Sequence, residues 1–234
     1  MLQIKQQVLE VHARLCAAYG APFPFFRDAD PLSELVGSLL SHRTKNADSA
    51  RALASLTERF SSWAEVRDAP TDEVRAAISQ ATWPEQKAPR IQSALRYVQA
   101  ARGELSLDFL AETPPAEAQA WLEQIPGVGP KTSAAVLLFS RLRMPALPVD
   151  SHHHRVAQRL GWIPGNVGPG PAHARLRVLL PKDWNAQTLY DHHEALMFHG
   201  QKCCFYKNPA CARCPVSELC PWGRAQLPGG MLGS

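Results

Sequence analysis

Apolar residues in this chain recur at the spacing of α-helices. The clearest set shares one face of a single helix and comprises Leu32, Leu35, Val36, Leu39 and Leu40. Asp30 followed by Pro31 is a typical helix start, because the carboxylate can cap the first turn and proline fits its first position. No run of alternating β-branched residues accompanies these patterns. The sequence therefore predicts an all-α fold with short connections, which the 20 prolines punctuate.

The composition of the 234 residues is that of an ordinary globular chain. Hydrophobic residues make up 45% and charged residues 20%, and the formal net charge of +4 permits a polyanionic partner without arguing for one. The N-terminus lacks the apolar core of a signal peptide, and the longest apolar run, residues 134–139, is too short to span a bilayer. We expect a soluble, monomeric, cytoplasmic protein, associated with the nucleoid in a bacterium, with no membrane partner.

Two proline-rich stretches interrupt the helical pattern, at residues 22–31 and 144–148. Such stretches are typical of crossings between domains. The sequence thus predicts one helical domain over residues 31–146. A second domain would combine residues 1–30 with residues 147–234.

A glycine-containing turn joins two helical segments at residues 125–132, between a helix that ends near Leu122 and one that runs through Ala134 to Leu142. Gly127 and Gly129 permit close backbone approach and conformations barred to other residues. With Val128 between them, they would offer amides to a DNA phosphate at a helix N-terminus. A plain turn between packed helices is the alternative. The next helix is apolar nearly all round, which indicates a buried and rigid base for the hairpin.

Lys131 lies in the first turn of that second helix. The positive end of the helix dipole disfavours a second positive charge there and should lower the pKa of the amine. A neutral amine is a nucleophile, whereas a charged one would serve as a phosphate contact. Spacing by itself favours the phosphate contact.

Asp150 precedes a helix that ends near Leu160, with Gly161 as its C-terminal stop. N-capping is the simplest role for this carboxylate, which would stay ionised and could also support positive charge developing at a sugar C1′. Three histidines follow, beginning with His152. Neighbours on a helix point about 100° apart, so we interpret them as a partly exposed turn facing DNA rather than as a metal site.

Four cysteines have the spacing C-x6-C-x2-C-x5-C, at Cys204, Cys211, Cys214 and Cys220. In a reducing compartment, four thiolates in a short loop indicate a metal site, and either Zn²⁺ or an iron-sulfur cluster suits them. Cys203 is a spare thiol that we interpret as a bystander. Cys16 stands apart and is typical of a small buried residue.

In combination these motifs resemble endonuclease III and its relatives among the helix-hairpin-helix DNA glycosylases. The resemblance runs from about Pro31 to Cys220 and is carried by residues 125–133, residues 149–156, His199-Gly200 and the cysteine spacing. It implies that Lys131 is the catalytic lysine and Asp150 the catalytic aspartate. It also implies that the four spaced cysteines hold a [4Fe-4S] cluster.

The resemblance further implies the architecture and the reaction. A six-helix barrel domain with the helix-hairpin-helix would be joined by a smaller helical cluster domain formed from both chain ends, with DNA in the cleft between them. The partner would be double-stranded DNA carrying damaged bases or abasic sites. A damaged pyrimidine would flip out of the duplex, Lys131 would attack C1′, and β-elimination would cleave the strand.

Some positions depart from the family pattern. Arg43 stands where the family often has a glutamine that fills the space of the flipped base, and Trp83 falls near a second wedge position usually held by a smaller apolar residue. A wedge of arginine and tryptophan can still stack into that gap. Between the first two cluster cysteines Lys207 is the one basic residue, and Gln201 replaces a basic residue, which indicates weaker DNA affinity. The segment from Lys131 to Asp150 is one residue longer.

Two alternatives stay open. A monofunctional adenine glycosylase would share the cluster, but it would lack the lysine and carry a glutamate at the position of Ser38. A DNA-binding paralogue with little catalytic power would keep the hairpin and the cluster. Lys131 and Ser38 speak against the first alternative, and Lys131 and Asp150 speak against the second.

Overall fold

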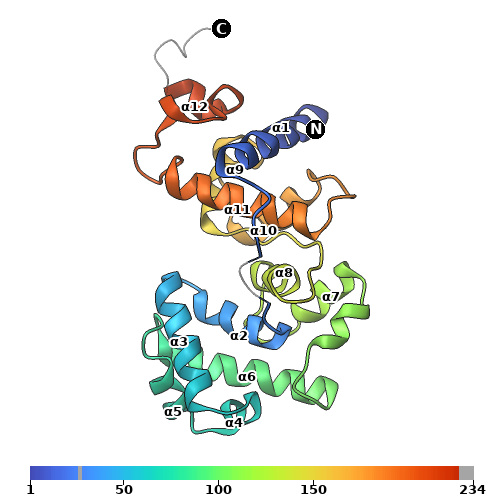
Figure 1. Cartoon of the computed structure of the whole chain (residues 1–234), viewed down its shortest axis with the longest axis vertical. Helices are drawn as coiled ribbons and strands as arrows, with labels where there is room; N and C mark the ends of the chain where they lie inside the picture. The colour runs from blue at the N-terminus through green and yellow to red at the C-terminus, as the bar shows by residue number, and fades with distance from the viewer. Residues whose placement is uncertain (26–27, 227–234) are drawn as a thin grey trace. The chain divides into compact units, whose positions relative to one another are not determined.

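The computed structural model describes residues 1–25 and 28–226, and these form helices connected by short turns, with no strand among them (Figure 1). The all-α prediction is confirmed. The chain divides into two compact units, one made of Met1–Phe25 with Leu147–Ser234 and the other of Phe26–Ala146. One boundary coincides with the expected position before Leu147, and the other lies five residues earlier than expected. No helix among the described residues is long and apolar enough to cross a membrane.

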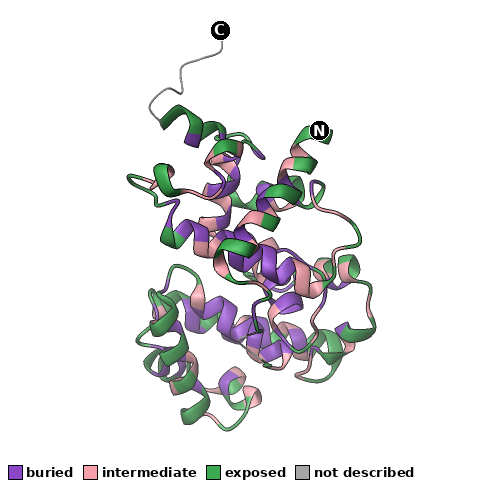
Figure 2. Cartoon of the chain, turned by 45° about the horizontal axis from the view of Figure 1, so that its top comes forward, coloured by how far each residue is buried: buried purple, intermediate pink, exposed green. Residues whose placement is uncertain are grey.

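Over the described residues 28–146, the middle unit holds seven α-helices and one short 3-10 helix. Their bounds are α2 (Pro31–Ser41), α3 (Asn46–Arg59), α4 (Trp63–Asp68), α5 (Thr71–Ala77), α6 (Pro84–Arg102), η1 (Asp108–Glu112), α7 (Pro115–Leu122) and α8 (Pro130–Phe139). Helix α2 packs against α3, α6 and α8, and nine of its eleven residues are buried. Buried positions follow the inward faces of the helices (Figure 2). As predicted, Asp30 caps α2, since its side chain accepts hydrogen bonds from the amides of Leu32 and Ser33.

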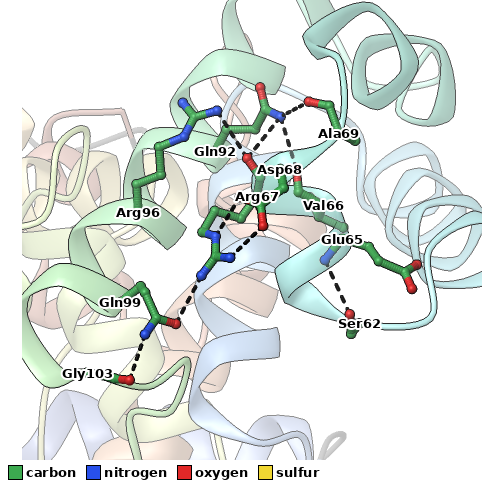
Figure 3. A network of polar contacts seen from close by, with 10 residues as sticks. All are labelled: Ser62, Glu65, Val66, Arg67, Asp68, Ala69, Gln92, Arg96, Gln99 and Gly103. Atoms are coloured by element: carbon green, nitrogen blue, oxygen red, sulfur yellow. Dashed lines mark hydrogen bonds and ion pairs between the residues drawn. The ribbon is translucent and has the colours of Figure 1, made fainter.

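Helices α4 and α5 are two short pieces separated by Ala69 and Pro70, because proline cannot continue a helix. Counted as one interrupted segment, they reduce the unit to the six helices that the family resemblance implies. The break is held by Gln92 of α6, which is fully buried (Figure 3). Its amide donates to the carbonyls of Val66 and Ala69 at 3.0 and 2.7 Å, and its carbonyl accepts the Thr71 hydroxyl at 2.7 Å.

Helix α8 ends at Phe139, three residues earlier than the sequence pattern predicts. Ser140 adopts an extended conformation there, and the amide of Arg141 donates to the Ala29 carbonyl at 2.9 Å instead of continuing the helix. The prediction that α8 is buried nearly all round is confirmed, because residues 133–138 are all buried.

The second unit gathers both ends of the chain. Its bounds are α1 (Leu2–Tyr19), α9 (Ser151–Arg159), α10 (Pro169–Arg177), α11 (Ala186–Lys202), η2 (Cys211–Arg213), η3 (Ser217–Leu219) and α12 (Pro221–Gln226). Helix α11 packs against α1 and α9, which makes it the centre of this unit. Helix α9 begins at the Asp150 cap and stops before Gly161, whose φ is +76°, as the sequence predicts.

Candidate functional site

The hairpin between α7 and α8 depends on Gly127. This residue has a φ of +83°, a conformation that other L residues rarely adopt. A Cβ at this position would lie 2.6 Å from Cδ of Arg90, because the arginine packs over the hairpin. Gly127 is therefore required both by its conformation and by the space available.

Gly129 and Val128 behave differently from the sequence-based expectation. Gly129 has a φ of −115° and a ψ of −177°, which any residue adopts, and a Cβ there would meet nothing within 4 Å. The expectation that Gly129 takes a special conformation is wrong. Val128 is buried, and its amide donates to the Ile125 carbonyl at 3.0 Å, so it stabilises the hairpin from within.

Lys131 is half-buried in the first turn of α8, and Pro130 occupies the first helical position as predicted. The Lys131 Nζ donates to the Ser41 hydroxyl at the end of α2 over 3.5 Å. His42, which follows Ser41, lies in a positively charged environment. Its pKa is lowered by burial and by the charges of Lys87, Lys131, Arg43 and Arg90. Lys87, Lys131, Arg43 and Arg90 therefore all lie near His42, and the end of α2 faces a positively charged region.

A buried cation organises the loop beside Lys131. Lys87 of α6 is 3% exposed, and its ammonium donates to the carbonyls of Leu40 and His42 and to the Thr44 hydroxyl at 2.6 to 2.8 Å. Thr44 also accepts the Thr82 amide at 3.1 Å. These bonds connect the loop after α2 to the loop before α6. Lys87 therefore determines the shape of both loops.

Arg43 and Trp83 stand on these two loops and come together. Both have left-handed backbones, with φ of +52° and +56°, and both are exposed. The guanidinium carbon of Arg43 lies 5.8 Å from the centre of the Trp83 ring, within the range of a cation–π contact. An exposed aromatic–cation pair of this kind can insert between bases.

Asp150 belongs to the other unit and caps α9, where its carboxylate accepts the His153 amide at 2.7 Å. Burial acts to raise the pKa of this carboxyl, but His193, the His153 amide and the neighbouring imidazoles together hold the pKa below its usual value. The carboxylate is ionised at neutral pH, as expected, and it has the capping role that was the simplest prediction. Lys131 and Asp150 lie in different units, so their pairing stays a prediction.

The three histidines of α9 point to different surroundings. His152 is half-buried and lies 3.1 Å from Nη2 of Arg155, while His154 lies 2.8 Å from the Val167 carbonyl. His153 is fully buried, so the expectation that all three form a partly exposed turn is wrong at this residue. Its place on the face of α9 that packs against α11 explains the burial.

The four spaced cysteines line one pocket in the unit formed by the chain ends. Cys204, Cys211, Cys214 and Cys220 all line it, together with apolar residues such as Val156 and Val216. Cys203, interpreted from the sequence as a bystander, lines the same pocket. Burial raises the pKa of the Cys214 thiol to about 12 and also raises the pKa of Cys211 and Cys220. These thiols need a metal centre to ionise.

The surroundings of this pocket fit a thiolate-bound cluster. The Gly223 amide donates to the Cys220 sulfur at 3.3 Å, and Nη1 of Arg159 donates to the Cys204 sulfur at 3.2 Å. Donors to sulfur stabilise the negative charge of cysteine-ligated clusters. Lys207 is exposed on the loop between the first two of these cysteines.

Comparison with known proteins decides the family. A family model described as "HhH-GPD superfamily base excision DNA repair protein" matches residues 36–182, which include Lys131 and Asp150. The chain belongs to this superfamily. Its members are DNA glycosylases of base excision repair, and the match ends before the first of the four spaced cysteines, Cys204.

Relatives within the superfamily cover different shares of the chain. Endonuclease III of Thermotoga maritima is 29% identical over 204 residues, covering 87% of this chain and 88% of the relative. A candidate DNA glycosylase of Arabidopsis thaliana is 33% identical over 172 residues. That alignment covers 74% of this chain but only 57% of the plant protein.

Solved structures of superfamily members share the fold. A trapped covalent intermediate of endonuclease III with DNA superposes with a TM-score of 0.79 at 23% identity, covering 95% of this chain and 98% of the other. A thermostable thymine-DNA glycosylase superposes with a TM-score of 0.74 at 20% identity, with the same coverage. At these identities the likeness shows the fold alone.

Sequence reasoning missed Lys87, Arg155 and Arg159. Nε of Arg155 and Nη1 of Arg159 donate to the carbonyls of Cys204 and Phe205 at 3.1 and 2.6 Å, and so attach the cysteine loop to α9. The two arginines are four residues apart and so share one face of α9, which was a usable signal, since two arginines on one helix face suit a single loop. Lys87 offered no local signal, because its partners lie more than 40 residues away in the chain.

Proposed function

We propose that this superfamily member is a bifunctional DNA glycosylase and abasic-site lyase. It removes oxidised or otherwise damaged pyrimidines from duplex DNA and cleaves the strand 3′ to the abasic site by β-elimination. The observation that carries the proposal is Lys131, a half-buried amine in the first turn of α8 that lies directly after the Gly127 hairpin and bonds to the Ser41 hydroxyl. A lysine in this setting is suited to nucleophilic attack.

In the proposed reaction the lone pair of the Lys131 nitrogen forms a bond to C1′. The glycosidic bond breaks, and its electron pair leaves with the base, which takes up a proton. The sugar ring then opens to a protonated Schiff base. Loss of a C2′ proton breaks the C3′–O bond, and the 3′ phosphate departs. Water hydrolyses the imine and releases the amine of Lys131.

Asp150 supplies fixed negative charge in this scheme. Its lowered pKa keeps it ionised at neutral pH, and its bond to the His153 amide holds its orientation. An ionised carboxylate stabilises positive charge on the sugar and can accept the proton of the attacking amine.

The DNA contacts of the proposal lie on both units. The backbone at Gly127 and Gly129 would contact a phosphate, with Val128 as the internal support of that turn. Arg43 and Trp83 would fill the gap left by the flipped base, as their contact with each other suggests. His152 and Lys207 are candidate backbone contacts on the other unit. We also propose that the protein acts as a monomer in the cytoplasm.

We propose that Cys204, Cys211, Cys214 and Cys220 hold a [4Fe-4S] cluster, as the family resemblance implies. Four thiols around one pocket, with donors to two of the sulfurs, fit this group. When bound, the cluster would crosslink the loop between α11 and α12. Arg159 would then hold the first ligand against α9.

Borohydride trapping on duplex DNA with an abasic site tests the lyase proposal. Reduction converts a Schiff base into a stable covalent adduct, so the native protein should give a trapped band and Lys131→Ala should give none. Lys5→Ala, which removes an exposed lysine of α1, should trap as the native protein does. The loss at Lys131 should reach at least about a thousandfold, since the covalent route disappears.

The other outcomes identify the rivals. Base release without trapping would show a monofunctional glycosylase and would overturn the lyase proposal. A mobility shift on DNA with neither base release nor trapping would identify a binding protein.

A further inference from the structure

We propose that the cysteine pocket contains a second metal site, made by His199, Cys203 and Cys214, that binds Zn²⁺ or another divalent cation with a preference for thiolates. The ligand atoms of these three residues lie within 4.8 Å of one another. They are the one group of three such side chains that lies so close among the described residues. The site uses Cys203, which the four-cysteine spacing leaves without a role.

The distance between His199 and Cys214 agrees with tetrahedral coordination. Zinc bonds of about 2.3 Å to sulfur and about 2.0 Å to nitrogen place neighbouring ligand atoms roughly 3.5 to 3.8 Å apart. Nε2 of His199 lies 3.7 Å from Sγ of Cys214. The sulfurs of Cys203 and Cys214 lie within 4.8 Å of each other. A metal ion can therefore be reached with little movement of these side chains.

His199 is held in the orientation that metal binding requires. It is 2% exposed on α11, and its Nδ1 lies 3.0 Å from the Tyr19 hydroxyl of α1. When the Nδ1–H donates to this hydroxyl, Nε2 keeps its lone pair and faces Cys214. Zinc-bound histidines commonly have such a partner on the second ring nitrogen.

The donor set selects the metal. One imidazole and two thiolates suit Zn²⁺, and water would complete a tetrahedron because the third protein ligand leaves one position open. Magnesium and calcium prefer oxygen ligands, which these three side chains do not supply.

Zinc in the second site and the cluster exclude each other, given the cluster ligands proposed above. Cys214 belongs to both ligand sets, so one chain holds either the cluster or zinc. His199 and Cys203 serve only zinc, whereas Cys211 serves only the cluster. The two states can therefore be separated by substitution.

A test measures iron, sulfide and cobalt binding on the full-length chain, with Co²⁺ as the spectroscopic substitute for zinc. The chain is purified without oxygen, and its cluster is removed by a chelator before Co²⁺ is added. The native protein should show strong sulfur-to-cobalt charge-transfer absorption with the band intensity of a tetrahedral site. Cys203→Ser should weaken Co²⁺ binding by at least about 100-fold. Loss of a residue that only hydrogen-bonds to a metal ligand costs about 10- to 100-fold in metal affinity, and loss of the ligand itself should cost more.

Two variants each remove a ligand of only one of the two sites. Cys203→Ser should retain native iron and sulfide before chelation, and Cys211→Ser should lose both but bind Co²⁺ as the native chain does. Helical circular dichroism equal to that of the native protein checks that each variant is folded.

Unchanged Co²⁺ binding in Cys203→Ser would overturn the proposal. A loss of Co²⁺ binding in Cys211→Ser would also overturn it, because the ion would then belong to the four spaced cysteines. A native chain without iron or sulfide that still binds Co²⁺ through Cys203 would retain the zinc site and overturn the cluster. The two failures are thus distinguishable.

Discussion

Gly127 and Gly129 are two residues apart and equivalent in the sequence pattern, but only one of them needs to be glycine. Gly127 has a positive φ and lies under Arg90, whereas Gly129 has an ordinary extended backbone with open space around its Cα. The role of a residue in this hairpin therefore depends on its backbone angles and its neighbours.

A pair of substitutions tests this difference. Gly127→Ala should lower the free energy of unfolding by about 2 kcal/mol, since the left-handed backbone costs 1–2 kcal/mol and Arg90 must move. Gly129→Ala should stay within about 0.5 kcal/mol, because a less favourable helix cap offsets a less flexible unfolded chain. Urea unfolding followed by circular dichroism measures both. Equal losses would contradict the assignment.

At the level of secondary structure elements, short helices depend on polar side chains from longer ones. Helices α4 and α5 have 6 and 7 residues, too few to be stable by themselves. The break between them leaves carbonyls at Val66 and Ala69 that Gln92 of α6 satisfies inside the core. One buried amide thus determines where two elements end and begin.

Gln92→Leu should lower the free energy of unfolding by about 2 to 4 kcal/mol, because the buried Val66 carbonyl, the half-buried Ala69 carbonyl and the Thr71 hydroxyl lose their partner. Gln99→Leu is the matched control on the same helix. Gln99 bonds to Gly103 and Arg67 at the more exposed end of the network, where water can replace it (Figure 3). It should cost less than about 1 kcal/mol. A similar loss in both variants, measured by urea unfolding, would refute the role of Gln92.

At the scale of the whole molecule, the unit made from the chain ends has an unusual core. His153 and His192 are fully buried, their rings lie 5.4 Å apart, and their ring nitrogens have no hydrogen-bond partner in the described part of the chain. Burial, with neighbouring histidines, holds the pKa of both well below the usual value. The pKa of Glu194 shifts in the opposite direction. Burial, Asp150 and Asp191 raise this pKa to about 7.

These shifts predict a loss of stability in mild acid. A histidine with a lowered pKa binds protons more readily in the unfolded chain, so its contribution falls as the pH drops below about 6.5. Glu194 changes the stability in the opposite direction. Because its pKa is raised in the folded chain, its contribution to stability is lost as the pH rises from about 4.5 through 7. The destabilising effect of the two histidines in mild acid should exceed the stabilising effect of the one carboxyl. Tm should therefore decrease from pH 7 to pH 5.5.

Two variants should change that slope in opposite directions. His192→Phe keeps a ring beside Trp162, whose ring is stacked on His192 at 6.0 Å, and it should make Tm less dependent on pH. Glu194→Gln removes the opposing group and should make the decrease steeper. Thermal unfolding at pH 7, 6.5, 6 and 5.5 measures both. A native Tm that is constant over this range would contradict the prediction.

Local chemistry was enough to predict the elements and several site residues. The Asp30 cap, the apolar faces of α8 and the cysteine spacing follow from interactions between residues a few positions apart. The family pattern added the roles of Lys131 and Asp150, which stay proposals.

Only the tertiary structure decided the rest. The end of α8, the burial of His153, the loop bonds of Lys87 and the place of Cys203 in the pocket all depend on residues distant in the chain. A sequence pattern records which residues prefer a helix or a cap, because those preferences are local. It does not record which side chains meet, since burial and hydrogen bonding between distant segments arise only once the chain has packed.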